Sequence, residues 1–277
     1  MDYDSPFYLS DCIFATQFTP DLIQTKYISK TAFSFFLCMV IFSISGFAQT
    51  KQVQHLQQIW VSYFNQSRLT KKWGIWDELQ VKTQNNFTNR FSNTEATIGA
   101  IYHLTNNIKL VDGYTLVTIY PSDGKTMNSF EHRSWQMIQL TTLKPKIKFT
   151  QWLRLEERFK SQIIDNNTLG KGFDFSCRTR YNIFMQIPLG KKKYAPGHFS
   201  ILTANELFLN IGGNTPLNTF DQDRFFIGTF YHVNKHDNIQ IGFTKVYQQM
   251  ANKSNFKSLD VIKLTYFNNL DFSVNKH

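Results

Sequence analysis

From about residue 57 onward, the chain repeats one pattern: a stretch of ten to fifteen residues alternates apolar with polar or small side chains, and a turn-forming segment follows. Successive side chains of a β-strand point to opposite faces, so a period of two predicts strands with one apolar and one polar face. In the segment 173–187, Cys177 and Tyr181 fall on one face, whereas Arg178 and Arg180 fall on the other. No helical pattern follows residue 48. The chain is therefore predicted to be all-β, with strands near residues 57–66, 73–84, 95–104, 107–120, 130–142, 147–160, 173–187, 199–211, 223–233, 237–248 and 257–268.

Periodicity alone does not separate a β-sandwich, with its apolar faces inside, from a membrane barrel, with its apolar faces outside. The segments are longer than the roughly five or six residues usual in globular strands, and they match the roughly nine to eleven of a tilted strand that crosses a bilayer. Short and longer connections largely alternate, as they do in outer-membrane barrels. Aromatic residues gather near the segment ends, at Trp60, Trp73, Trp76, Tyr120, Phe159 and Tyr247. These features predict an antiparallel transmembrane β-barrel of ten to twelve strands.

The number of strands is a separate question, because bacterial barrels normally have an even number. Eleven segments are visible, so either one segment is missed or one is not a wall strand. We prefer twelve strands. The segment 57–66 is the one expected to lie outside the wall, because the parity of the strands would start it on the outer side of the membrane.

The composition narrows the class of protein. Aromatic residues make up 16% of the 277 residues and charged residues 18%, which is far from a disordered composition. The mean hydropathy of −0.32 means that polar residues dilute the apolar ones at close range, as in two-faced strands and unlike membrane helices. The formal net charge is +10, but the basic residues are scattered singly apart from Lys191–Lys193, so no nucleic-acid partner is predicted.

The N-terminal region resembles an export signal. Lys26 and Lys30 precede an apolar run over residues 31–48, and small residues, Gly46 and Ala48, stand before a predicted cut at Gln49. This arrangement is typical of a secretory signal peptide, and an uncleaved membrane anchor is the alternative.

The expected division of the chain is an N-terminal extension with the signal peptide (1–48), a short leader (49–56), a barrel domain (57–270) and a C-terminal tail (271–277). Cleavage would leave Cys177 as the single cysteine, so no internal disulfide is expected.

Several spaced segments carry a family resemblance: IWVSYFNQSRLTKKWGIWDELQ, EHRSWQ, RLEERF, RTRYNIFMQIPL, NELFLNIG and FDQDRFFIGTFYHV. In this order they resemble the DUF2490 family, a group of exported proteins of unknown function typical of Bacteroidetes and placed with outer-membrane β-barrels. The resemblance covers roughly residues 55–270. It implies a barrel in the outer membrane of a Gram-negative bacterium, with outer-membrane lipid and the barrel assembly machinery as partners. It brings no activity and no site residue.

Two residues of the run Glu131–Ser134 could serve a hydrolase. Ser134 and His132 share one face of their segment, as a serine nucleophile and its base would in an interfacial lipid hydrolase. No third orienting residue can be named, so a polar cluster without catalytic function is the preferred interpretation. The remaining histidines show no metal-ligand spacing, and neither a metal nor a cofactor is expected.

The stronger pattern is charge on the predicted inner face. It comprises Glu78, Lys82, Arg154, Glu156, Arg158, Arg178, Arg180, Glu206 and Arg224. These charges could pair across neighbouring strands and hold the wall together, or they could form a basic constriction that selects anions. A barrel of ten to twelve strands is narrow, which favours pairing.

The function expected from this pattern is a narrow pore or passage for small solutes, including anions, without enzymatic activity. The alternatives are the interfacial lipid hydrolase, a non-catalytic surface or scaffold barrel whose loops bind a partner, and a soluble periplasmic β-sandwich.

Overall fold

A computed structural model describes residues 52–87, 90–122, 124–190, 193–213, 218–250 and 254–273, all of which belong to one compact unit, Thr50–His277. The predicted signal peptide and its cleavage site between Ala48 and Gln49 lie outside the described residues.

The described residues form eleven strands in one closed barrel, and no helix occurs among them. The strands are β1 (Gln52–Arg68), β2 (Trp73–Thr83), β3 (Phe91–His103), β4 (Ile108–Ile119), β5 (Ser129–Lys144), β6 (Ile147–Ile163), β7 (Leu169–Pro188), β8 (His198–Gly213), β9 (Phe220–His232), β10 (Asp237–Gln249) and β11 (Asn255–Asn268). Each strand is antiparallel to its neighbour in sequence. In the part of the chain that the structure describes, no helix is long and apolar enough to cross a membrane.

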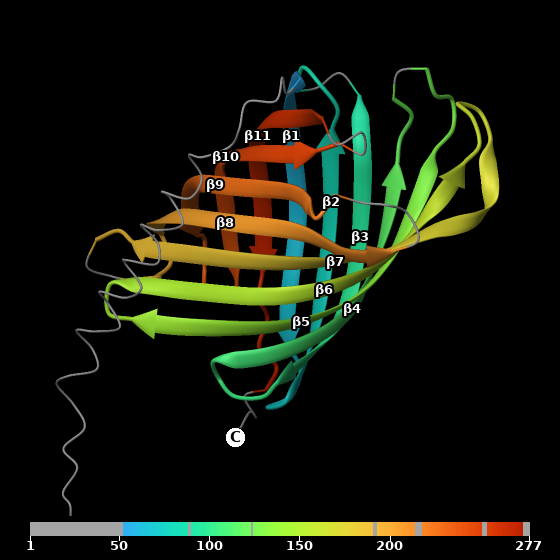
Figure 1. Cartoon of the computed structure of the whole chain (residues 1–277). Coiled ribbons are helices and arrows are strands. Elements are labelled where there is room, and N and C mark those ends of the chain that lie inside the picture. Colours follow the sequence, from blue (N-terminus) through green and yellow to red (C-terminus); the bar gives the residue numbers. More distant parts are fainter. Residues whose placement is uncertain are drawn as a thin grey trace, which may run out of the picture. The chain divides into compact units, whose positions relative to one another are not determined.

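The barrel closes between β1 and β11, which lie side by side and run in the same direction (Figure 1). Their parallel ladder extends from the pair Gln52–Asn255 to the pair Asn65–Asn268. The preference for twelve strands was therefore wrong, and so was the exclusion of the first segment, which is a full wall strand. Eleven strands are joined by ten antiparallel steps, and this even number of reversals leaves the first and last strands parallel. A parallel ladder also satisfies the backbone groups of both strands. Even numbers in bacterial barrels are a strong tendency that is not required by hydrogen bonding.

The strands begin and end at two rims. The turn end carries the connections 69–72, 104–107, 145–146, 189–197 and 233–236, and the loop end carries 84–90, 120–128, 164–168, 214–219 and 250–254. The expected alternation of short and long connections is only partly correct. The connection between β6 and β7 at the loop end is short, 164–168, whereas 189–197 at the turn end is long.

β1 enters at the loop end, and β11 leaves at the turn end. The first strand begins at Gln52, inside the segment 49–56 that was expected to be a leader. After β11, the chain runs along the end of β1: the Arg68 amide donates to the Leu270 carbonyl at 2.8 Å, and the Phe272 amide donates to the Arg68 carbonyl at 2.8 Å. The hydroxyl and amide of Ser273 both donate to the Asp271 carboxylate and hold its pKa below the usual range.

The two faces of the wall differ as the alternation predicts. Leu153, Leu155 and Phe159 of β6 point outward and are 50%, 41% and 39% exposed, whereas Arg154, Glu156 and Arg158 of the same strand point inward and are buried. Apolar side chains therefore cover the outside of the barrel, and polar and aromatic side chains fill much of the inside.

One close approach depends on a glycine. Trp135 of β5 is fully buried and lies over Gly113 of β4, its register partner. A Cβ atom at Gly113 would come within 2.3 Å of the Trp135 ring. Gly113 therefore leaves the space in which the indole lies flat against the wall.

Candidate functional site: the lumen

A cavity of about 750 Å³ lies inside the barrel. Residues from both rims line it: Asn106 and Asn107 belong to the turn end, and Leu56, Gln248 and Lys257 lie near the loop end. The lumen is therefore hollow along much of its length and is not completely filled by side chains.

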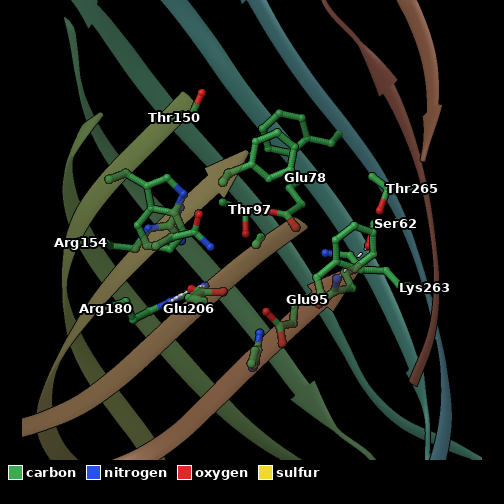
Figure 2. Close-up of a pocket in the computed structure, with 18 of the residues that line it drawn as sticks. Ser62, Glu78, Glu95, Thr97, Thr150, Arg154, Arg180, Glu206, Lys263 and Thr265 are labelled. Atoms are coloured by element: carbon green, nitrogen blue, oxygen red, sulfur yellow. Dashed lines mark hydrogen bonds and ion pairs between the residues drawn. The ribbon is translucent and has the colours of Figure 1, made fainter. Parts of the chain in front are cut away.

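The wall of this cavity is rich in cations. Eleven Lys and Arg side chains line it, against four Glu side chains. The structure places all nine residues of the predicted inner face on this wall, namely Glu78, Lys82, Arg154, Glu156, Arg158, Arg178, Arg180, Glu206 and Arg224. Figure 2 shows several of these side chains converging on the cavity from different strands. This placement follows from the alternation of side chains along each strand, which is a local property of the chain.

One ion-pair cluster is built around Glu131 of β5. Its carboxylate accepts hydrogen bonds from Arg133 Nε at 2.7 Å and from Arg158 Nε at 2.6 Å, and it is 1% exposed. Arg133 also reaches Glu95 at 3.4 Å, and Glu95 pairs closely with Lys82. Sequence reasoning missed Glu95, Glu131 and Arg133. Glu131 and Arg133 share the parity of the inward Trp135, so the alternation could have identified them.

A second ion-pair cluster is built around Glu156 of β6. Arg178 Nη2 and Arg180 Nη1 donate to its two oxygens at 2.5 and 2.6 Å. Arg178 also donates to Asp221 at 2.7 Å, and Arg180 pairs closely with Glu206. Sequence reasoning missed Asp221. The bulge between β8 and β9 falls at this residue, and its inward contact reverses the parity expected from the alternation.

The two clusters favour pairing as the main role of the inward charges on β5 to β8. Transferring an ion from water to a protein interior is costly, and close partners offset that cost only when both are present. Glu131 and Glu156 are each 1% exposed and each has two arginine donors, so their charges are compensated.

At mid-height the cations stack on aromatic rings, and we call this arrangement the cation–aromatic belt. The guanidinium of Arg154 lies 4.0 Å from the centre of the Trp135 ring and 5.1 Å from that of Trp152. Arg180 is also stacked on Trp152, at 5.3 Å. The belt continues around the lumen through Arg180 and Arg224 on Phe208 at 4.5 and 4.4 Å, and through Arg224 and Lys82 on Trp60 at 5.0 and 4.7 Å.

Not every cation of the wall has a carboxylate partner. Among the described residues, no ion pair within 4.0 Å involves Lys109, Lys148, Arg224, Lys257 or Lys263, all of which line the cavity. Lys109 and Lys148 lie near the turn end, Arg224 and Lys263 lie at mid-height, and Lys257 lies near the loop end. These five residues form a file of uncompensated positive charges from one rim towards the other, and we call it the cation file.

The hydrolase residues lie on the opposite face of β5. Ser134 donates to the Glu157 carboxylate of β6 at 3.0 Å, and the His132 ring forms a short hydrogen bond with the Tyr114 hydroxyl of β4. Within the described part of the chain, no hydrogen bond joins Ser134 to His132. The two residues expected to act together thus have different partners, and this geometry does not provide a nucleophile with its base. Glu157 does not lie at the end of its strand, since β6 continues beyond it to Ile163.

The described residues contain no group of three or more His, Cys, Asp or Glu side chains that could hold a metal ion. The polar groups of the lumen are instead arginines, lysines, glutamates, amides and hydroxyls, which bind ions and polar solutes by charge and hydrogen bonding.

Comparison with known proteins gives one relationship. The family model described as "Protein of unknown function (DUF2490)" matches residues 57–257, which is most of the chain. Neither a curated protein nor a solved structure matches the chain.

Proposed function

The chain belongs to the DUF2490 family, whose description assigns no activity, and we propose from its geometry that it is a transmembrane barrel of a Gram-negative outer membrane that gives small anionic solutes a narrow passage. The observation that carries the proposal is the cavity along the barrel with the cation file on its wall.

The outer surface supports the membrane location. Outer-membrane barrels carry an apolar band about 25 Å high between two aromatic girdles. Here aromatic pairs on the outside occur near both rims: Trp73–Tyr102 and Phe199–Tyr231 lie near the turn end, and Phe91–Tyr120 and Phe159–Phe175 lie towards the loop end. Between them the outward side chains are mainly apolar, including Ile98 and Leu79, which are 60% and 58% exposed. The predicted export signal fits the same location.

Outward carboxylates interrupt this apolar surface, and among the described residues five of them each accept a hydrogen bond from a donor on a neighbouring strand between the two rims. The pairs are Asn65–Asp77 at 3.2 Å, Gln136–Asp112 at 3.1 Å, Ser134–Glu157 at 3.0 Å, Asn205–Asp223 at 2.9 Å and Lys245–Asp260 at 2.7 Å. A carboxylate in hydrocarbon is costly, and a cross-strand donor reduces that cost. The pairing is therefore compatible with a lipid-facing wall.

The lumen supports the passage of anions. The cation file offers successive positions at which an anion can exchange water for a fixed positive charge, and conduction requires several sites of moderate affinity in place of one tight site. The ion-pair clusters are centred on β5–β8 and extend to Glu95 of β3, Lys82 of β2 and Asp221 of β9. Uncharged polar side chains line the opposite side, including Gln58, Ser62 and Gln80. This polar side lets water and solute remain hydrated next to the cations.

The direct test is conductance. Purified protein, shown to be folded by a heat-modifiable shift on a gel, is inserted into planar bilayers in a salt gradient. The expected result is stepwise conductance with a reversal potential that indicates preference for chloride over potassium. Folded barrels that leave the bilayer tight, or that prefer cations, would refute the passage. Fractionation of cells tests the location separately, and extraction of the protein by high salt alone would refute membrane insertion.

A further inference from the structure

The mid-height of the lumen holds two separate groups of cations whose hydrogen-bonding capacity is largely unused. The first is Arg154 of β6, and the second consists of Arg224 of β9 and Lys263 of β11. Figure 2 shows Arg154 and Lys263 on opposite sides of the cavity. The strand order agrees, because β6 and β11 are separated by about half of the closed barrel.

Arg154 is buried in the cation–aromatic belt but has little hydrogen bonding. Its nearest carboxylate oxygen, on Glu156, is 3.9 Å away, and its Nη2 reaches only the Met137 sulfur at 3.7 Å. Its Nε is buried and has no hydrogen-bond partner among the described residues. The residue is 7% exposed, and an arginine has five N–H donors to satisfy. Glu156 accepts hydrogen bonds from Arg178 and Arg180, so both of its carboxylate oxygens already have partners.

Arg224 and Lys263 form the second group, around Trp60. Arg224 stacks on the Trp60 ring at 5.0 Å and donates one hydrogen bond, to Gln222 at 3.3 Å. Lys263 is the register partner of Trp60 across the β1–β11 seam and has neither a hydrogen bond nor an ion pair among the described residues. Glu78 and Glu206 attract Lys263 through space, whereas Arg224 repels it. Two neighbouring cations therefore lack a carboxylate in contact.

The glutamates of the wall do not supply hydrogen-bonded partners for Arg154, Arg224 and Lys263. Of the four glutamates that line the cavity, Glu95, Glu156 and Glu206 are engaged in ion pairs, and Glu78 has none within 4.0 Å among the described residues. Arg154 is buried, and Arg224 and Lys263 are partly exposed to the cavity. Cations with free donors on both sides of a polar cavity are complementary to a ligand with a negative charge at each end. The planar guanidinium of Arg154 suits a carboxylate in particular, because it can donate two parallel hydrogen bonds.

We propose that the mid-height of the lumen is a binding site for a small dicarboxylate, which bridges Arg154 on one side and Arg224 with Lys263 on the other. The proposal rests on the proposed function in that the dicarboxylate is the class of anion that the passage selects. Aromatic rings of the belt flank both ends, so the linker between the carboxylates lies against Trp152 and Trp60. Glu78 repels the ligand and keeps its affinity moderate, as release from a passage requires.

Binding to the folded barrel in detergent tests the site without reference to conductance. Isothermal titration calorimetry compares succinate with butyrate and adipate with hexanoate, so each dicarboxylate has a monocarboxylate control of equal carbon number. The expected result is that one dicarboxylate binds at least roughly tenfold more tightly than its control, because the second carboxylate adds charge-assisted hydrogen bonds. Equal binding of dicarboxylates and their controls, or none, would overturn the proposal.

Substitutions at each end of the proposed dicarboxylate site test which residues bind the two carboxylates. Arg154→Gln and Lys263→Gln are each expected to reduce affinity for the preferred dicarboxylate to that of its monocarboxylate control, whereas Glu78→Gln is expected to increase it severalfold. Lys71→Gln, which removes one charge from the exposed 69–72 turn, serves as the control and leaves affinity unchanged. Since Lys263 belongs to no ion pair among the described residues, its variant is expected to keep the fold, and a wild-type affinity in Lys263→Gln would refute the bridging geometry. Dicarboxylate binding without conductance would refute the passage alone, and conductance without dicarboxylate preference would refute the site alone.

Discussion

The two sides of the lumen use charge in opposite ways. On the β5–β8 side, Glu131 and Glu156 are almost fully buried, and each accepts hydrogen bonds from two arginines. The members of the cation file have no carboxylate within 4.0 Å among the described residues; four of them lie on β4, β9 and β11, and Lys148 lies at the turn end of β6. The first arrangement has compensated charges and stabilises the barrel. The second leaves positive charge facing the cavity, where a solute or water can contact it. The same residue types therefore have different roles, decided by which partners the register supplies.

The largest expected effect comes from breaking the paired side. Glu156→Gln removes the negative charge between Arg178 and Arg180 but keeps the shape of the side chain. Removal of one partner of a buried pair costs about 3–5 kcal/mol, because the remaining charges are left uncompensated. Unfolding in urea, followed by the loss of the heat-modifiable band, measures the change. Glu78→Gln is the control, since Glu78 is in no ion pair among the described residues, and a similar loss in both variants would contradict the distinction between the two sides.

The next largest effect is expected from a substitution that displaces the Trp135 ring, which packs beside the ion-paired side of the lumen. Gly113→Val places side-chain atoms where the Trp135 ring lies, and overpacking of this kind typically costs about 1–3 kcal/mol. Displacement of Trp135 also removes the ring on which Arg154 stacks. The measurement is again urea unfolding, together with the near-ultraviolet circular dichroism of the tryptophans. An unchanged tryptophan signal would show that the belt does not depend on this close approach.

Substitutions in the cation file are expected to have a smaller effect on stability but a clear effect on ion selectivity. Lys109→Gln and Lys148→Gln each remove one uncompensated charge near the turn end. Because neither residue is in an ion pair among the described residues, stability should change by less than about 1 kcal/mol, as for most substitutions outside a buried network. The reversal potential in a salt gradient should move towards zero, and further in the double variant. A selectivity unchanged in the double variant would remove the cation file from the mechanism.

A comparably small effect on stability, with no effect on selectivity, is expected outside the lumen. Ser134→Ala removes a single hydrogen bond to Glu157 on the outer face, which corresponds to about 0.5–1.5 kcal/mol. No change in ester hydrolysis should accompany it, since the Ser134 hydroxyl donates to Glu157 and His132 is bonded to Tyr114. A fluorogenic ester assay on the folded barrel in detergent checks this. Hydrolysis by the wild type that disappears in the variant would restore the hydrolase interpretation.

The sequence by itself determined the all-β character, the place of nearly every strand and the face on which most side chains lie, with Asp221 at a bulge as an exception. Arg154, Glu156 and Arg158 were assigned to the inside by alternation alone, and they line the cavity. This is possible because the side-chain direction in a strand has a period of two, which is a local property of the chain. The same rule was available for Glu131 and Arg133, which share the parity of Trp135.

Only the tertiary structure decided how the strands close and which charges meet. The parallel seam between β1 and β11 joins residues about two hundred positions apart, and no local pattern specifies it. The register across neighbouring strands brings Arg178 and Arg180 to Glu156, and it leaves Lys263 beside Trp60 without a carboxylate in contact. Alternation says only that a residue points inward. Whether an inward charge is compensated depends on the shear of the closed barrel, which aligns side chains from strands distant in sequence.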